Sequence, residues 1–162
     1  FTQSNDDLLF FNITKSLDSI LNLLSASLKY ENINLVKDFD TEDIYIEGNI
    51  IKFRQTILNI LNNAKDVLKE SDKSYKYIKV TLKNHKNSVE VFIENNGKKL
   101  DNNIKDKIFD IYFTTKHKNQ GTGLGLFICH EIITKYFKGE ISAKNLTNQG
   151  VSFNIKFPKR HS

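Results

Sequence analysis

Hydrophobic positions recur with two different periods along the chain, and these periods separate expected helices from expected strands. Apolar residues follow helical spacing over residues 14–28 and 51–69, and in the second segment they form one continuous stripe. Residues 124–137 are expected to form a third helix, and residues 104–110 a short one. The pattern therefore predicts helices early, in the middle and late in the chain.

Alternating or β-rich segments lie between these helices and are bounded by turn residues such as Asn96-Gly97. The expected strands are residues 8–13, 33–38, 43–47, 77–83, 89–94, 140–144 and 151–157. A doubly wound sheet would need repeated strand–helix–strand crossovers, which this order lacks. The order instead predicts an α+β fold, a two-layer α/β sandwich.

Composition narrows the class of protein. The chain has 162 residues, 39% hydrophobic and 27% charged, which fits a single globular domain over residues 1–162. No apolar run is long enough to cross a bilayer, and the lone Cys129 fits a reducing, cytoplasmic compartment. The net charge of +5 comes from scattered lysines, whereas nucleic-acid binders gather theirs in a stripe. We therefore expect neither membrane nor nucleic-acid contact.

The second predicted helix carries a polar cluster. Asn59, Asn63 and Asp66 fall within an arc of roughly 60° on the side away from the apolar stripe. Three oxygen-bearing side chains placed in this way could hold Mg²⁺, which usually shares its ligands with phosphates. Taken alone, the helix favours the simpler interpretation of a solvated polar face.

A glycine-rich segment precedes the last predicted helix. It consists of Gly121, Thr122, Gly123, Leu124, Gly125 and Leu126. Glycines let the backbone approach a ligand, free N–H groups at a helix start attract phosphate, and Thr122 could cap the helix. No parallel-strand unit surrounds the segment, so a dinucleotide fold is a poor match. Phosphate binding is favoured over a purely structural role.

Four segments resemble the motifs of bacterial sensor histidine kinases. Residues 59–66 resemble the N box, residues 108–116 the F box, residues 121–128 the second glycine box, and residues 150–158 the terminal strand. Their order and spacing agree over residues 30–158. The chain is therefore identified as similar to the catalytic ATP-binding domain of these kinases, and it looks most like the nitrogen-regulation type.

The resemblance implies the fold shared with gyrase-type topoisomerases and heat-shock chaperones, the Bergerat fold. In that fold, ATP lies between helices on one face of a mixed sheet, under a flexible lid. The resemblance also implies that Asn63 coordinates Mg²⁺ and that Asn59, with Asp66 nearby, shapes the phosphate side. The remaining implied ATP-binding residues are Phe109, Thr115 and Lys116 at the lid, with Tyr112 and Phe113 as further lid anchors, and Gly121, Thr122, Gly123, Leu124, Gly125 and Leu126.

The base end of the implied pocket departs from the family pattern. The family's Asp-Asn-Gly-x-Gly is Asn95 to Lys99 here, so that Gly97 remains but Lys99 replaces a glycine. Val151 stands where the family has a threonine. ATP could bind more weakly, another nucleotide or base orientation could be preferred, or nucleotide binding could be lost. Because Asn63, Lys116 and the glycine box are intact, we expect weakened but real ATP binding.

A phosphoacceptor histidine is not recognisable in the chain. His130-Glu131 superficially resembles an acceptor pair but lies inside a predicted helix, and the other histidines are His85, His117 and His161. We expect the acceptor hairpin upstream of residue 1, in a parent that is a homodimer, while residues 1–162 alone could be monomeric. The expected reaction is transfer of the ATP γ-phosphoryl group to that histidine, followed by transfer to a response regulator. A degenerate docking module and a topoisomerase or repair ATPase piece are the alternatives.

Overall fold

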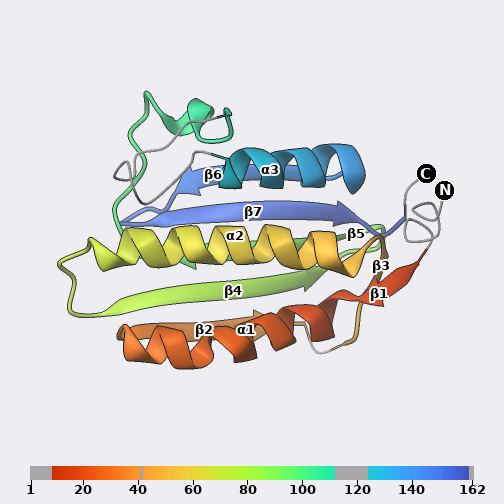
Figure 1. Cartoon of the computed structure of the whole chain (residues 1–162), viewed down its shortest axis with the longest axis horizontal. Helices are drawn as coiled ribbons and strands as arrows, with labels where there is room; N and C mark the ends of the chain where they lie inside the picture. Colours follow the sequence, from red (N-terminus) through yellow and green to blue (C-terminus); the bar gives the residue numbers. More distant parts are fainter. Residues whose placement is uncertain (1–8, 41, 112–123, 161–162) are drawn as a thin grey trace.

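The computed structural model describes residues 9–40, 42–111 and 124–160, and it forms two layers (Figure 1). The elements in chain order are β1 (Phe10–Asn12), α1 (Ile13–Tyr30), β2 (Ile33–Phe39), β3 (Tyr45–Glu47), α2 (Ile50–Lys69), β4 (Lys76–Asn84), β5 (Ser88–Asn95), a 3-10 turn (Lys105–Lys107), α3 (Gly125–Glu131), a π-helical turn (Ile132–Tyr136), β6 (Glu140–Asn145) and β7 (Val151–Pro158).

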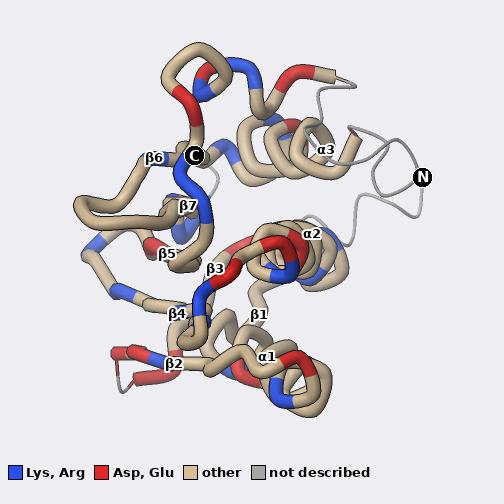
Figure 2. Tube along the Cα trace, turned by 90° about the vertical axis from the view of Figure 1, so that its left-hand side faces the viewer, with Lys and Arg blue, Asp and Glu red and all other residues tan. Residues whose placement is uncertain are grey.

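The main sheet has five strands in the order β2-β4-β5-β7-β6. β2 and β4 are parallel, whereas every other neighbouring pair is antiparallel, so the sheet is mixed. All three helices lie on one face of this sheet, and the opposite face carries no helix in the described ranges (Figures 1 and 2). The predicted α+β two-layer sandwich is confirmed, as is the mixed sheet that the resemblance implied.

The apolar stripe of α2 forms the centre of the core. Its members, all buried as predicted, are Phe53, Ile57, Ile60, Leu61, Ala64 and Leu68. Asn49 begins the helix, because its Oδ1 accepts hydrogen bonds from the amides of Ile51 and Lys52 at 2.8 and 3.1 Å. Opposite the stripe, alternate residues of β5 and β7 complete the core.

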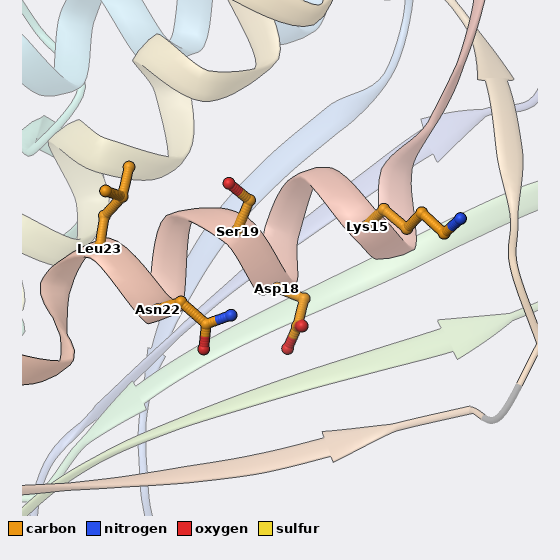
Figure 3. Close-up of a pocket in the computed structure, with 5 residues that line it drawn as sticks. All are labelled: Lys15, Asp18, Ser19, Asn22 and Leu23. Carbon is orange, nitrogen blue, oxygen red and sulfur yellow. The ribbon is translucent and has the colours of Figure 1, made fainter.

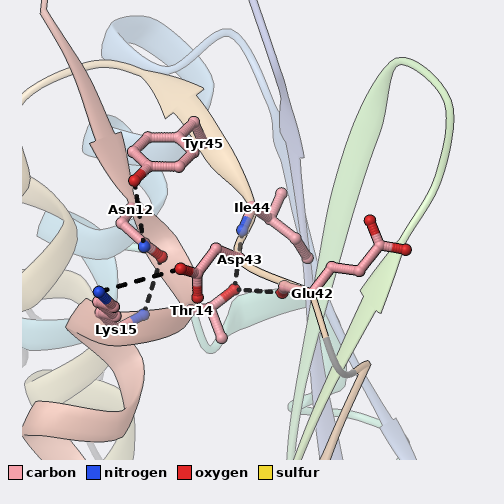
Figure 4. Close-up of polar contacts among 7 residues, drawn as sticks. All are labelled: Asn12, Thr14, Lys15, Glu42, Asp43, Ile44 and Tyr45. Atoms are coloured by element: carbon pink, nitrogen blue, oxygen red, sulfur yellow. Dashed lines mark hydrogen bonds and ion pairs between the residues drawn. The ribbon is translucent and has the colours of Figure 1, made fainter.

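The start of α1 is tied to the segment before β3 (Figure 4). Asn12 caps the helix by accepting from the Lys15 amide at 3.0 Å, and Thr14 Oγ1 accepts from the Ile44 amide at 3.1 Å. Ile44 is thus bonded to α1, and β3 begins at Tyr45, two residues later than the sequence pattern predicted. This segment anchors the two-stranded β1–β3 sheet at one end of the domain.

Two helix predictions need correction. Of the short helix predicted over residues 104–110, only the 3-10 turn Lys105–Lys107 forms, because Ile108 alone of its apolar residues is buried. The helix predicted over residues 124–137 is α3 followed by the π-helical turn. In this turn the Phe137 amide donates to the Ile132 carbonyl, five residues back. The Phe137 ring also meets the Phe157 ring edge-on, with ring centroids 5.1 Å apart.

None of the helices in the described ranges is long and apolar enough to cross a membrane.

Candidate nucleotide-binding site

The polar cluster of α2 reaches α3 at one of its members, Asn59. Asn59, Asn63 and Asp66 are each partly buried. Burial raises the pKa of the Cys129 thiol of α3 to about 12, and the neighbouring Asn59 side chain partly opposes this rise. The thiol itself donates to the Thr56 carbonyl at 3.6 Å. At Asn59, this polar face of α2 therefore contacts α3 and is only partly exposed.

The chemistry of this cluster suits a cation that is shared with a ligand. In the described part of the chain, no three His, Cys, Asp or Glu side chains gather into a self-sufficient metal site. Amide oxygens of Asn59 and Asn63, with one carboxylate at Asp66, leave most coordination positions to water and phosphate. Mg²⁺ is commonly bound in this way, so the residues present fit the metal.

The end of β5 forms the second part of the site. Asn95 is only 2% exposed, and its Oδ1 accepts a hydrogen bond from the Gly97 amide at 2.8 Å. In the β5–β7 register, Asn95 lies opposite Val151, and both share the helix-covered face with the buried Ile93. The structure therefore brings together Asn95, Gly97 and Val151, the predicted base end.

Lys99 is bonded to the turn between β6 and β7. Its Nζ donates to the Thr147 carbonyl at 3.0 Å, on the turn between β6 and β7. Beside it, the Leu100 amide donates to Asn145 Oδ1 at 2.8 Å, and Asn145 Nδ2 donates back to the Leu100 carbonyl at 2.9 Å. These bonds join the loop after β5 to the turn between β6 and β7.

Asn96 and Asn145 are two positioning residues that the sequence analysis did not single out. Asn96 Oδ1 accepts from the Tyr77 amide at 2.9 Å, and its Nδ2 donates to the Tyr75 carbonyl at 2.8 Å. Together with the Asn145 pair, these bonds brace the loop after β5 from both sides. The Asn-Asn pair before Gly97 was a sequence signal for Asn96, but no local pattern marks Asn145.

The glycines of the site fall into two kinds. A Cβ on Gly97 would lie 2.6 Å from Val67 Cγ1, and one on Gly150, whose φ is +108°, would lie 2.0 Å from the Asn95 carbonyl oxygen. A Cβ on Gly125, by contrast, would meet no atom of the other described residues within 4 Å. Gly97 and Gly150 are therefore required by packing, whereas Gly125 faces open space.

The lid side of the site is described only at its two ends. The Phe109 ring lies 5.5 Å from His130 and meets Phe153 edge-on at 6.3 Å, so it joins α3 to β7. At the other end, Leu126 is partly buried, and Leu124 occupies the N-cap position that had been predicted for Thr122. The predicted residues outside the described ranges are Tyr112, Phe113, Thr115, Lys116, Gly121, Thr122 and Gly123.

The described histidines occupy positions compatible with structural roles. His85 Nε2 lies 2.6 Å from Glu90 Oε1 in the β4–β5 hairpin, and His130 stacks near Phe109 within α3. His117 and His161 lie outside the described ranges.

A separate hollow on the outside of α1 does not belong to this site (Figure 3). Its described lining comes from that helix alone and consists of Lys15, Asp18, Ser19, Asn22 and Leu23. One of these groups, the Asp18 carboxylate, already pairs with Lys37 of β2. None of the residues predicted from the sequence lies there.

Comparisons with known proteins agree with the fold. Residues 48–161 match the family described as "Histidine kinase-, DNA gyrase B-, and HSP90-like ATPase". The solved catalytic domain of histidine kinase ThkA is 32% identical, with a TM-score of 0.83, over 94% of this chain and 95% of that one. ThkA has also been solved in complex with the response regulator TrrA, where the match is 27% identical, with a TM-score of 0.78, over 93% of this chain and 41% of that chain.

Curated relatives are longer than this chain. Sporulation kinase A of Bacillus subtilis is 25% identical over 151 residues, which cover 93% of this chain and 24% of the relative. The histidine-protein kinase AtoS of Escherichia coli is 29% identical over 143 residues, which cover 88% of this chain and 22% of the relative. The chain thus spans about a quarter or less of these proteins. With the family match and the shared fold, it belongs to the histidine kinase-, DNA gyrase B- and HSP90-like ATPases, as the catalytic ATPase domain of a two-component sensor histidine kinase.

Proposed function

We propose that the domain binds a Mg²⁺–nucleoside triphosphate, ATP in the first instance, between α2, the start of α3 and the end of β5. The observation that carries this proposal is the partly buried polar cluster Asn59, Asn63 and Asp66 on one side of α2, with Asn59 beside Cys129 of α3. A helix face that is both polar and covered needs polar partners, and phosphates with their cation supply them.

Each part of the site has a proposed role. Asn63 is a ligand of the metal, while Asn59 and Asp66 orient the phosphate side. At the start of α3, the open space at Gly125 lets the backbone approach phosphate oxygens closely. Asn95 and Val151 contact the base. Thr115, Lys116 and the glycines before Leu124 complete the lid in this proposal.

The reaction that follows from these roles is transfer of the γ-phosphoryl group to a histidine outside residues 1–162. Bound Mg²⁺ would neutralise charge on the phosphate oxygens. The chain itself contributes positioning: α2 and α3 hold the phosphates while the braced loop after β5 holds the base. No nucleophile within the described residues is needed, because the acceptor lies on another hairpin.

The wider setting is also part of the proposal. The acceptor hairpin precedes residue 1 in a homodimeric parent, and a response regulator receives the phosphoryl group in the cytoplasm. The complex of ThkA with TrrA supports a regulator as partner. The Asn-Ala-Lys-Asp sequence of residues 63–66 and the Phe-Thr-Thr-Lys sequence of residues 113–116 support a nitrogen-regulation-like subgroup.

A docking module without nucleotide is the second candidate. The loss of a carboxylate at Asn95 favours it, because a charged hydrogen-bond acceptor is roughly twice as strong as a neutral one. The topoisomerase alternative has no comparable support, since the relatives described above are sensor kinases.

Thermal melting separates these candidates. A ligand that binds only the folded state stabilises it by about 2.7 kcal/mol at a concentration of one hundred times Kd. We expect millimolar Mg-ATP to raise the melting temperature and EDTA to reduce that shift. Asn63→Ala should weaken the shift, while Asn62→Ala, an exposed neighbour on the same helix, should not. Unchanged melting with both Mg-ATP and Mg-ADP would favour the docking module.

A further inference from the structure

The orientation of the Asn95 carboxamide is set by the loop that follows it. Its Oδ1 lies 2.8 Å from the Gly97 amide nitrogen in a buried environment. Turning the carboxamide over would place an NH₂ group against an N–H group, leaving both donors without an acceptor. Asn95 Oδ1 therefore stays the acceptor of the Gly97 amide.

The other polar atom of the same carboxamide is the nitrogen Nδ2, a donor. Among the residues that the structure describes, none accepts a hydrogen bond from Asn95 Nδ2. The residue opposite it in the sheet, Val151, has no polar side-chain atom to offer. Asn95 thus presents a donor to a ligand at this place, whereas a carboxylate would retain an acceptor oxygen after bonding Gly97.

The surrounding braces prevent an easy rearrangement of this donor. The loop after Asn95 is bonded through Leu100 to Asn145 and through Lys99 to the Thr147 carbonyl. On its other side, Asn96 is bonded to the backbone of the segment that leads into β4. The Asn95 carboxamide is consequently held in place with its NH₂ group as the donor to a ligand.

A donor distinguishes between purines by the group at C6. Adenine carries an amino group there, which is itself a donor, whereas 6-oxopurines carry a carbonyl acceptor. We propose that Asn95 makes this domain prefer 6-oxopurine nucleoside triphosphates, those of inosine and guanosine, over ATP. The inference rests on the proposed function, with the C6 edge of the base directed at Asn95.

Calorimetric titration with Mg-ATP and Mg-ITP tests the inference, because these two nucleotides differ in the C6 group and the attendant protonation of N1. We expect ITP to bind about tenfold more tightly than ATP, a difference of about 1.4 kcal/mol. GTP should also bind more tightly than ATP, and weaker binding of GTP would overturn the extension to guanosine. Equal or tighter binding of ATP relative to ITP would overturn the preference itself.

Two variants assign the effect to the side chain. Asn95→Asp keeps an oxygen for the Gly97 amide and should reverse the preference towards ATP. Asn87→Asp adds the same charge in the exposed turn between β4 and β5 and should leave the ratio of ITP to ATP affinity unchanged. An unchanged ratio in Asn95→Asp would contradict the role of Asn95. Failure of every nucleotide to bind would instead refute the proposed function along with this inference.

Discussion

The two ends of the candidate site differ in what surrounds their glycines. At the base end, a side chain on Gly97 or Gly150 would collide with the protein itself, and hydrogen bonds brace the loop on both sides. At the start of α3, a Cβ on Gly125 would meet nothing within 4 Å in the part of the chain that the structure describes. The difference indicates that the base end is built as a rigid part of the fold, whereas the α3 end leaves room that a ligand could use.

Replacing Gly150 should have the largest effect. Gly150→Val places a Cβ where the Asn95 carbonyl oxygen lies and forces a β-branched residue to adopt φ near +108°. We expect the free energy of unfolding to fall by more than about 3 kcal/mol in urea denaturation. A loss below about 1 kcal/mol would show that the base end is not rigid.

Removing the Asn145 brace should have an intermediate effect. Asn145→Ala eliminates two hydrogen bonds and leaves the partly buried Leu100 amide without its acceptor. We expect stability to fall by about 1–3 kcal/mol and nucleotide affinity to fall with it. Lys99→Ala, which removes one exposed bond, is the matched control and should cost less than about 1 kcal/mol. Equal losses of stability in both variants would argue against a bracing role of the Asn145–Leu100 hydrogen bonds.

The contact between α2 and α3 should be sensitive to alkaline pH. Burial raises the pKa of the Cys129 thiol to about 12, so the folded state keeps a proton that the unfolded state releases near pH 9. The thiol's contribution is therefore complete below pH 9 and is lost as pH rises towards 12. We expect about 1 kcal/mol of lost stability by pH 10. Urea denaturation at pH 7 and pH 10 measures this loss of stability. The loss should be smaller in Cys129→Ala than in the wild type. An equal loss in both proteins would contradict a contribution of the buried thiol to stability.

Replacing Gly125 should have the smallest effect on folding. Gly125→Ala adds a methyl group in open space at the start of a helix, so stability should stay within about 0.5 kcal/mol of the wild type. The same methyl group should weaken Mg-nucleotide binding in a calorimetric titration, because it occupies room next to the backbone. Unchanged nucleotide affinity together with unchanged stability would contradict a role of Gly125 in nucleotide binding.

The sequence predicted those parts of the fold that local periodicity controls. The stripe from Phe53 to Leu68 and the alternation in β4 and β5 both appear as expected, because burial on one face imposes a period on the chain. The π-helical turn before Phe137 was missed, since it depends on packing against Phe157, which lies twenty positions further along.

The site was predictable in its motif residues but not in its bracing. Asn95, Gly97 and Val151 belong to recognisable boxes, and the structure brings them together. The direction of Lys99 and the pairing of Asn145 with Leu100 depend on how the β6–β7 hairpin folds back over a separation of 45 residues. No pattern within either segment encodes that meeting.

The most direct test of the account is to observe which backbone amides respond to nucleotide. An NMR titration of the ¹⁵N-labelled domain with Mg-ATP or Mg-ITP should shift the amides of Asn63, Gly97 and Gly125 together. Amides of Lys79 and Lys156, on the sheet face opposite the helices, should stay unchanged. An unaltered spectrum at millimolar nucleotide, or shifts confined to α1 and the β1–β3 sheet, would contradict a nucleotide site between α2, α3 and the end of β5.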